Sequence, residues 1–362
     1  MAEIQIKQVT KTFGRFDAVL DLDLELEDGT FVALLGPSGC GKSTTMNMLS
    51  GLLEPTRGEI LFDGAVVNKL KPGDRNIGFV FQNYAIFTHM SAFDNIAFGL
   101  RVRKQPADEI REEVHQVARL LGIENMLDRR TTDLSVNDLQ KVAIGRSMIT
   151  KPGIFLLDEP FSNLDARFRS YMRAELKKLQ RELSQTMIYV THDQVEAMSM
   201  AEKIAIMDRG QLQQYGTPDE VYNQPANRFV AGFVGSTMMN FVPTTLDRSG
   251  GDLVLTMPLA DARPLTVHNR DGGDDSDSFT MGIRSEHIEL VDPGSETASL
   301  RGTVTLLESL GPRNIVHLSS DGYLLRVTVP PTVRPRVGEA VGLELDARRV
   351  HVFADASGTA LA

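Results

Sequence analysis

The stretch FVALLGPSGCGKS, residues 31–43, decides the fold of this 362-residue chain. Its first five residues are apolar and indicate a strand buried on both faces, which leads into GPSGCGKS, a match to G-x-x-x-x-G-K-[ST]. Glycines in such a loop let backbone N–H groups surround phosphate oxygens, and a following helix adds its positive dipole end. We therefore predict an ATP-binding loop made of Gly36, Pro37, Ser38, Gly39, Cys40, Gly41, Lys42, Ser43 and Thr44.

Two carboxylates follow a second apolar run, in the segment IFLLDEP. That run predicts a buried strand that ends at Asp158 and Glu159. With a phosphate loop in the same chain, Lys42 is expected to reach the β- and γ-phosphates, while the Ser43 hydroxyl and Asp158 hold Mg²⁺. Glu159 is then the candidate general base that activates the attacking water.

Outside these motifs, the arrangement of apolar and polar residues indicates an α/β fold. IQIKQV and LDLDLEL alternate as half-exposed antiparallel strands do, whereas GIFLLDEP and TMIYVTHD indicate buried strands. Residues 106–121 have helical spacing after a proline. We expect a largely parallel α/β domain over residues 1–235 and, from the short β-like pieces that follow, a small all-β barrel domain over residues 236–362.

Composition narrows the possible partners. The formal charge of −10 disfavours a protein that binds nucleic acid by neutralising phosphates, so we expect no nucleic-acid partner. Cys40 is the single cysteine, which excludes an internal disulfide. The start of the chain does not read as a secretory signal, and no apolar run reaches the ~18 residues of a membrane span. A role at a membrane would therefore require other subunits.

With these motifs in place, the whole chain resembles the ATP-binding cassette (ABC) subunits of transporters, most closely the ATPases of carbohydrate importers of the maltose-importer type. The resemblance implies further site residues. Phe13, with Phe16 as the alternative, would stack on adenine, and Gln82 in FVFQNYAIF would contact Mg²⁺ and the attacking water. His192 in VTHD would contact the γ-phosphate, and the loop Ser162–Asp165 would cross to a second ATPase subunit, with Asp165 at the nucleotide.

The resemblance also implies domains and partners. Residues 83–150 would form a helical subdomain that receives a transmembrane permease subunit, although Phe87 and Thr88 depart mildly from the family pattern there. The C-terminal domain would be an oligonucleotide/oligosaccharide-fold (OB-like, TOBE-type) regulatory domain. It would scaffold a dimer or bind a small molecule or regulator protein. The protein would then lie peripherally on the cytoplasmic face of the inner membrane, linked indirectly to an external solute-binding protein.

One family motif departs from its usual form. Where the family signature has L-S-G-G-Q, this chain has LSVND, residues 134–138. Ser135 is retained and could still contact a γ-phosphate. Val136 adds a branched side chain, and Asp138 adds a carboxylate that, with Ser135, fits the helix-capping pattern S-x-x-[DE].

Three readings of LSVND remain open. The chain pairs with a different ATPase subunit, which we favour, or it forms a homodimer with two weakened sites, or it binds ATP as a regulatory or scaffold subunit. A DNA-maintenance or translation factor built on the same cassette is disfavoured. Such proteins tend to carry a long inserted coiled coil or a second cassette, and this chain has neither.

Overall fold

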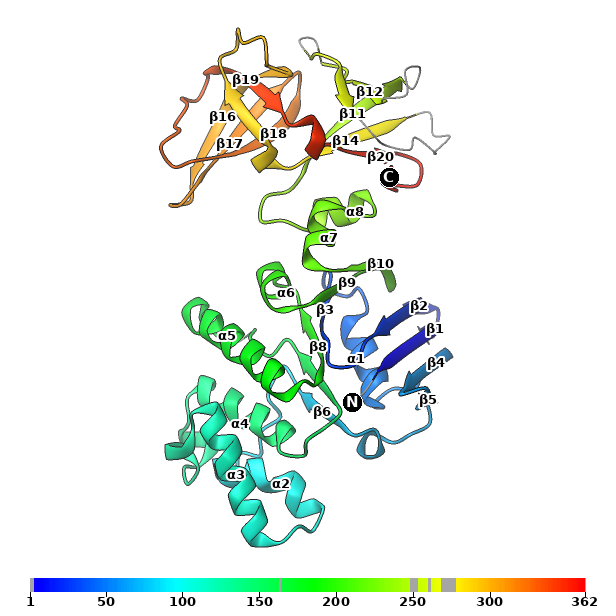
Figure 1. Ribbon diagram of the computed structural model, residues 1–362, viewed down its shortest axis with the longest axis vertical. Coiled ribbons are helices and arrows are strands. Elements are labelled where there is room, and N and C mark those ends of the chain that lie inside the picture. Colours follow the sequence, from blue (N-terminus) through cyan, green and yellow to red (C-terminus); the bar gives the residue numbers. More distant parts are fainter. Residues whose placement is uncertain (1–2, 163, 248–252, 260–261, 268–277, 362) are drawn as a thin grey trace. The chain divides into compact units, whose positions relative to one another are not determined.

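The computed structural model describes residues 3–162, 164–247, 253–259, 262–267 and 278–361. Contacts divide the chain into two compact units, residues 1–219 and 220–362. The first unit combines two sheets with helices, and the second consists mainly of strands (Figure 1). The predicted fold class, an α/β P-loop domain followed by an all-β domain, is confirmed.

A six-stranded sheet carries the phosphate loop, in the order β10-β9-β3-β8-β7-β6. Neighbouring strands from β9 to β6 are parallel, and β10 pairs antiparallel with β9. β3 and β8 are buried along their whole length, which explains their continuous apolar sequences. The strands are β3 (Phe31–Leu35), β6 (Ile77–Val80), β7 (Ile154–Asp158), β8 (Thr186–Thr191), β9 (Lys203–Asp208) and β10 (Gln211–Gly216).

A second sheet of the first unit is antiparallel, in the order β2-β1-β4-β5. Its strands are β1 (Ile4–Phe13), β2 (Phe16–Leu26), β4 (Arg57–Phe62) and β5 (Ala65–Val66). The turn between β4 and β5 has positive φ at both central residues, 48° at Asp63 and 76° at Gly64. This is the conformation that a tight hairpin requires, and the Asp-Gly pair supplies it.

Helices connect the strands of the first unit. They are α1 (Lys42–Ser50), α2 (Ala92–Val102), α3 (Ala107–Leu121), α4 (Val136–Met148), α5 (Ala166–Leu183) and α6 (Gln194–Met200), with short 3₁₀ turns at Pro72–Asp74, Glu124–Met126 and Thr131–Asp133. α2, α3 and α4 share a hydrophobic core of their own, within the range expected for a helical subdomain. In the described part of the chain, no helix is long and apolar enough to cross a membrane.

The second unit contains two five-stranded sheets. One has the order β13-β12-β11-β14-β20, from β11 (Asn240–Asp247), β12 (Leu253–Thr256), β13 (Leu265–Val267), β14 (Phe279–Ile283) and β20 (His351–Ala354). The other has the order β15-β19-β16-β17-β18, from β15 (Ile288–Val291), β16 (Leu300–Ser309), β17 (Asn314–Ser320), β18 (Tyr323–Val329) and β19 (Ala340–Leu345). Short 3₁₀ turns lie at Ser285–His287 and Ala347–Arg349. Both sheets contribute to one hydrophobic core, so they fold as one domain.

Two short helices, α7 (Pro218–Asn223) and α8 (Arg228–Phe233), precede these strands. The contact-based division falls inside α7, whereas the composition of the sequence changes near residue 236. Hydrogen bonds explain the difference. Arg284 Nη1 donates to the carbonyl of Val234 at 2.7 Å, and the amide of Arg228 donates to that of Gly358 at 2.7 Å. Composition cannot report such contacts, and the limits 1–235 and 236–362 remain a prediction.

Candidate active site

The predicted phosphate loop joins β3 to α1, as its sequence context required. Its first glycine is sterically necessary, because a Cβ on Gly36 would lie 2.2 Å from the carbonyl oxygen of Met207. Gly41 has a φ of 106°, and a Cβ there would lie 2.6 Å from the carbonyl oxygen of Ala18. Any larger residue at either position would displace backbone, so the sequence pattern follows from the shape of the loop.

Lys42 is buried at the start of α1, with 6% of its surface exposed. Its Nζ donates hydrogen bonds of 2.8 Å to the carbonyl oxygens of Gly36 and Pro37 and lies 3.5 Å from Cys40 Sγ. The loop therefore holds one cation against its own backbone, beside the exposed hydroxyl of Ser43. This arrangement matches the requirements of a polyphosphate.

A cleft of about 420 Å³ lies over this loop. Its lining residues come from the phosphate loop, the β1–β2 hairpin and the end of β7: Phe13, Phe16, Ala18, Ser38, Gly39, Gly41, Lys42, Ser43, Thr44 and Glu159. A cleft of this size suits a ligand as large as a nucleotide.

Phe13 and Phe16 face each other across the β1–β2 hairpin, and both line the cleft. They are 50% and 63% exposed, so neither is a core residue at a strand end. Lys11 Nζ lies 5.2 Å from the centroid of the Phe13 ring. Either ring is available to stack on a base, and the preference for Phe13 remains a prediction.

Glu159 lies between two other predicted catalytic residues. Gln82 Nε2 donates to its Oε2 at 3.3 Å, and His192 Nδ1 lies 3.2 Å from its Oε1. These residues follow β6, β7 and β8, which are neighbours in the sheet, and the carboxyl ends of parallel strands meet at one edge. The fold thus brings together three segments that are far apart in sequence.

At the end of β7, Glu159 has an unfavourable backbone conformation and Asp158 has an unfavourable environment for its charge. Glu159 has a φ of 43°, in the left-handed region that non-glycine residues rarely occupy, and its amide donates to the Val190 carbonyl at 3.0 Å. Burial and, secondarily, the adjacent Glu159 raise the pKa of Asp158, while Lys42 partly offsets them. Such costs are common where a fold fixes reactive groups.

The signature segment forms the N-terminus of α4. Ser135 is the N-cap, and its hydroxyl lies 2.6 Å from Asp138 Oδ2. The Asp138 carboxylate also accepts from the Ser135 amide at 3.3 Å, and Ser135 Oγ accepts from the Asp138 amide at 3.3 Å. The predicted capping box is therefore present. Val136 is 47% exposed beside it.

Ser135 and Asp165 are not among the residues that line the cleft. Asp165 caps α5 instead, where its Oδ1 accepts from the Phe168 amide at 2.9 Å. Within the predicted crossing loop Ser162–Asp165, Asn163 lies outside the described residues. Roles of Ser135 and Asp165 at a nucleotide therefore remain a prediction.

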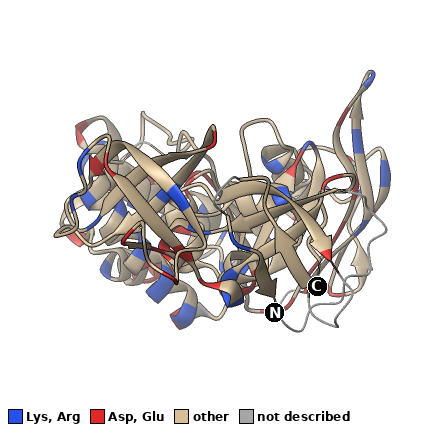
Figure 2. Cartoon of the chain, turned by 90° about the horizontal axis from the view of Figure 1, so that it is seen from above, with Lys and Arg blue, Asp and Glu red and all other residues tan. Residues whose placement is uncertain are grey.

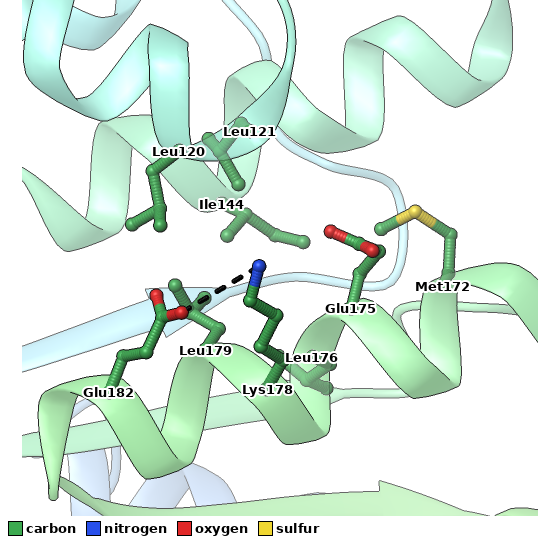
Figure 3. A pocket seen from close by; sticks show the side chains of 9 residues that line it. All are labelled: Leu120, Leu121, Ile144, Met172, Glu175, Leu176, Lys178, Leu179 and Glu182. Atoms are coloured by element: carbon green, nitrogen blue, oxygen red, sulfur yellow. Dashed lines mark ion pairs between the residues drawn. The ribbon is translucent and has the colours of Figure 1, made fainter.

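Two other hollows among the described residues of the first unit contain none of the predicted residues. An apolar groove of about 30 Å³ lies where Leu120 and Leu121 of α3 and Ile144 of α4 face α5, beside the Lys178–Glu182 ion pair (Figure 3). It has room for about one water molecule. A wider cleft of about 860 Å³ next to β1 and β2 is lined by charged side chains, including Asp23, Glu25 and Lys7.

Sequence reasoning missed a partly buried cluster of polar side chains next to His192. It consists of Arg169 on α5, Asp193 at the N-cap of α6 and Glu196 on α6. Asp193 Oδ2 lies 3.2 Å from Arg169 Nη1, and Glu196 Oε1 lies 3.7 Å from Arg169 Nε. The available signal was the N-cap pattern of Asp193 at the start of α6. Nothing in the local sequence pointed to Arg169.

The fold and the site define a P-loop nucleotide-binding cassette followed by an all-β domain. A model of the ABC transporter family matches residues 19–162, and a model of the TOBE domain matches residues 281–353. The trehalose/maltose import ATP-binding protein MalK of Thermococcus litoralis is 44% identical over 100% of both chains. The sn-glycerol-3-phosphate import ATP-binding protein UgpC 1 of Rhizobium johnstonii is 41% identical over 99% of this chain and 96% of that one.

A solved structure agrees with these relatives. The ATP-binding cassette MJ0796, in a dimeric post-hydrolysis state with ADP and Pi, is 30% identical with a TM-score of 0.55 and covers 59% of this chain and 98% of that chain. The chain belongs to the ATP-binding subunits of ABC transporters, in the carbohydrate-importer group, and is an ATPase. Its signature motif differs from the family form.

Proposed function

We propose that this chain is the energy-coupling subunit of an ABC importer and that it pairs with a second, different ATPase subunit. The observation that carries the proposal is an asymmetry within one chain. Glu159, Gln82 and His192 converge above an intact phosphate loop, whereas Asp138 closes the end of α4 that would cover the partner's ATP. One composite site would therefore hydrolyse ATP, and the other would be slow.

In the hydrolytic site, Glu159 takes a proton from the attacking water. Gln82 and His192 hold its carboxylate from both sides, with His192 also directed to the γ-phosphate. Lys42 binds the β- and γ-phosphates, and Phe13 stacks on the adenine. Because all of these groups belong to one chain, a partner needs to supply only an intact signature segment.

Mg²⁺ fits the oxygen atoms available here. Ser43, Gln82 and Asp158 offer a hydroxyl, an amide and a carboxylate, all hard oxygen donors of the kind that Mg²⁺ prefers. Among the described residues, no group of three or more His, Cys, Asp or Glu could hold a metal by itself, so phosphate oxygens and water would complete the set. When bound, the ion would neutralise charge on the phosphates.

We propose transmembrane permease subunits as the mechanical partners, docked on the segment after Gln82. There the Phe87 and Phe98 rings lie 4.7 Å apart, and Arg146 lies over the Phe87 ring at 5.1 Å and donates to the Ala85 carbonyl at 2.7 Å. This ordered surface supports docking. The chain would then lie peripherally on the cytoplasmic face of the inner membrane, linked indirectly to an external solute-binding protein.

The relatives support a carbohydrate, a polyol or a glycerol-phosphate-like compound as the imported solute, because their names specify trehalose, maltose and sn-glycerol-3-phosphate. We expect no nucleic-acid partner. Acidic and basic residues are intermixed along the chain (Figure 2), and the net charge is −10.

The test compares ATP hydrolysis by the purified chain alone with hydrolysis after addition of a companion ATPase that has an intact signature. Pairing predicts low turnover alone and a large increase in the mixture, which the Glu159→Gln variant of this chain should abolish. Full turnover by the chain alone would contradict the pairing and favour a homodimer. ATP binding without turnover in any assembly would favour a regulatory or scaffold subunit.

A further inference from the structure

Arg169 connects three segments of the first unit. It lies one turn after Asp165 on α5, and its Nη2 donates to the Leu164 carbonyl at 3.1 Å. Its Nη1 donates to Asp193 Oδ2 at 3.2 Å, and its Nε lies 3.7 Å from Glu196 Oε1. One planar group therefore contacts both the loop before α5 and the segment that carries His192.

Glu196 helps to hold the Arg169 guanidinium in place. Its side chain is 5% exposed, and its Oε2 accepts hydrogen bonds from Tyr189 at 2.6 Å and Thr191 at 2.7 Å. Burial, reinforced by Glu196, holds the pKa of Tyr189 well above its usual value, so the phenol remains a donor. A buried carboxylate with these partners has little freedom to move.

Both neighbours of His192 belong to the same network. The amide of Asp193 donates to Thr191 Oγ1 at 2.9 Å, so the backbone on each side of the histidine is held. Because His192 itself lies 3.2 Å from Glu159, a shift of Arg169 would be transmitted to the catalytic carboxylate.

We propose that Arg169 is a positioning residue that ties the loop carrying Asp165 to His192, and so makes the geometry of Glu159 depend on that loop. The inference rests on the proposed roles of His192 and Glu159. The loop is the part of the chain proposed to meet the second subunit, so Arg169 would report subunit contact to the catalytic site. A guanidinium suits this role because its rigid fork fixes directions as well as distances, which a lysine ammonium does not.

The main test is Arg169→Lys, which keeps the charge and loses the fork. In the assembly that hydrolyses ATP, we expect kcat to fall about tenfold while the affinity for ATP stays within about twofold, because misplacement acts on the transition state.

The matched control is Arg75→Lys. Arg75 is buried and, like Arg169, donates to backbone carbonyls, here those of Met48, Leu49, Leu70 and Asn68, which lie outside the segment that carries His192. That control should lower Tm and leave kcat unchanged.

A double-mutant cycle with His192→Ala tests the connection itself. If Arg169 acts through His192, Arg169→Lys should have little further effect on the residual rate of the His192→Ala variant. Equal fold-losses in both backgrounds would overturn the inference.

A second variant covers the case in which Arg169→Lys does not fold. Asp193→Asn keeps an oxygen acceptor for the α6 cap and removes the ion pair, so it should lower kcat in the same way. Unchanged kcat in the folded variants, with loss of Tm alone, would show a purely structural arginine. Full turnover in His192→Ala would instead overturn the proposed active site, which distinguishes the two failures.

Discussion

The phosphate loop and the signature segment each lead into the N-terminus of a helix, but the two helix N-termini differ in how they are capped. The N-cap of α1 is Gly41, which provides no side-chain cap, and the first turn of α1 contains no acidic residue. The N-cap of α4 is Ser135, which forms a complete capping box with Asp138. The backbone N–H groups at a helix start need acceptors and favour negative charge. In α1 no side chain caps these groups, whereas α4 supplies its own carboxylate.

This difference in capping affects both the stability of each helix and its ability to bind an anion. A self-capped helix start gains stability from its side chains, while an uncapped one gives up that stability and can bind phosphate. Glu159 and Asp158 also lower stability at a functional site: Glu159 has a positive φ, and Asp158 has a raised pKa. The comparison supports the proposal that this chain keeps its own hydrolytic site and offers a weakened signature segment to a partner.

The strongest test of the intact region is Glu159→Gln. Removing the general base should lower turnover by about 10²- to 10⁴-fold, while ATP binding persists because the phosphate loop is unchanged. Phosphate release and nucleotide titration measure the two effects. The matched control is Glu175→Gln on α5, which lines the small apolar groove and should be neutral. Unchanged hydrolysis in Glu159→Gln would remove the catalytic assignment.

The strongest test of the altered region restores its family form. The triple change Val136→Gly, Asn137→Gly and Asp138→Gln removes the branched side chain and the internal carboxylate. If the end of α4 limits turnover of the chain alone, the rate should rise about three- to tenfold, as expected for freeing a helix N-terminus for an anion. No gain in steady-state hydrolysis would mean that the two helix starts do not differ in function as proposed.

A smaller effect separates capping from nucleotide contact. Ser91 is the N-cap of α2 and, like Ser135, has an aspartate three residues further on; its hydroxyl accepts from the Asp94 amide at 3.0 Å. Ser91→Ala and Ser135→Ala should each lower the free energy of unfolding by about 1 kcal/mol, as measured by urea denaturation. Lower turnover only in Ser135→Ala would show that its hydroxyl also contacts a nucleotide; equal turnover would assign it to capping alone.

The smallest expected effect concerns pH. Asp158 has a pKa raised above 3.8, so the folded state binds its proton more tightly than the unfolded state. Its contribution is therefore most favourable below pH 3.8 and is lost as the pH rises through the folded pKa. Asp158→Asn should be more stable than the natural chain near pH ~7, and the difference should shrink on acidification. A constant difference across thermal unfolding at several pH values would contradict this.

Much of the fold could be predicted because local sequence and local structure agree. The apolar run of β3 followed by GPSGCGKS required a strand, a tight loop and a helix. The helix of residues 107–121 follows from its spacing and its proline start. In each case neighbouring residues determine the structure, so no long-range contact was needed.

The division into units could not be predicted in the same way. α7 and α8 are held to the second unit by Arg284, which lies about 50 residues further along the chain and is 2% exposed. A buried guanidinium that donates to distant carbonyls leaves no periodicity in the sequence. Composition therefore placed the change of domain later than the contacts do.

The sequence by itself determined the class of chemistry: a phosphate loop, a carboxylate pair after a buried strand, and a signature closed by its own aspartate. These are properties of short segments, whose residue types fix which backbone shapes and charges are possible. The tertiary structure alone decided that Gln82 and His192 meet at Glu159, because strand order sets which loop ends are neighbours. It also placed Arg169 between Leu164 and Asp193, since one side chain can join segments that only packing brings together.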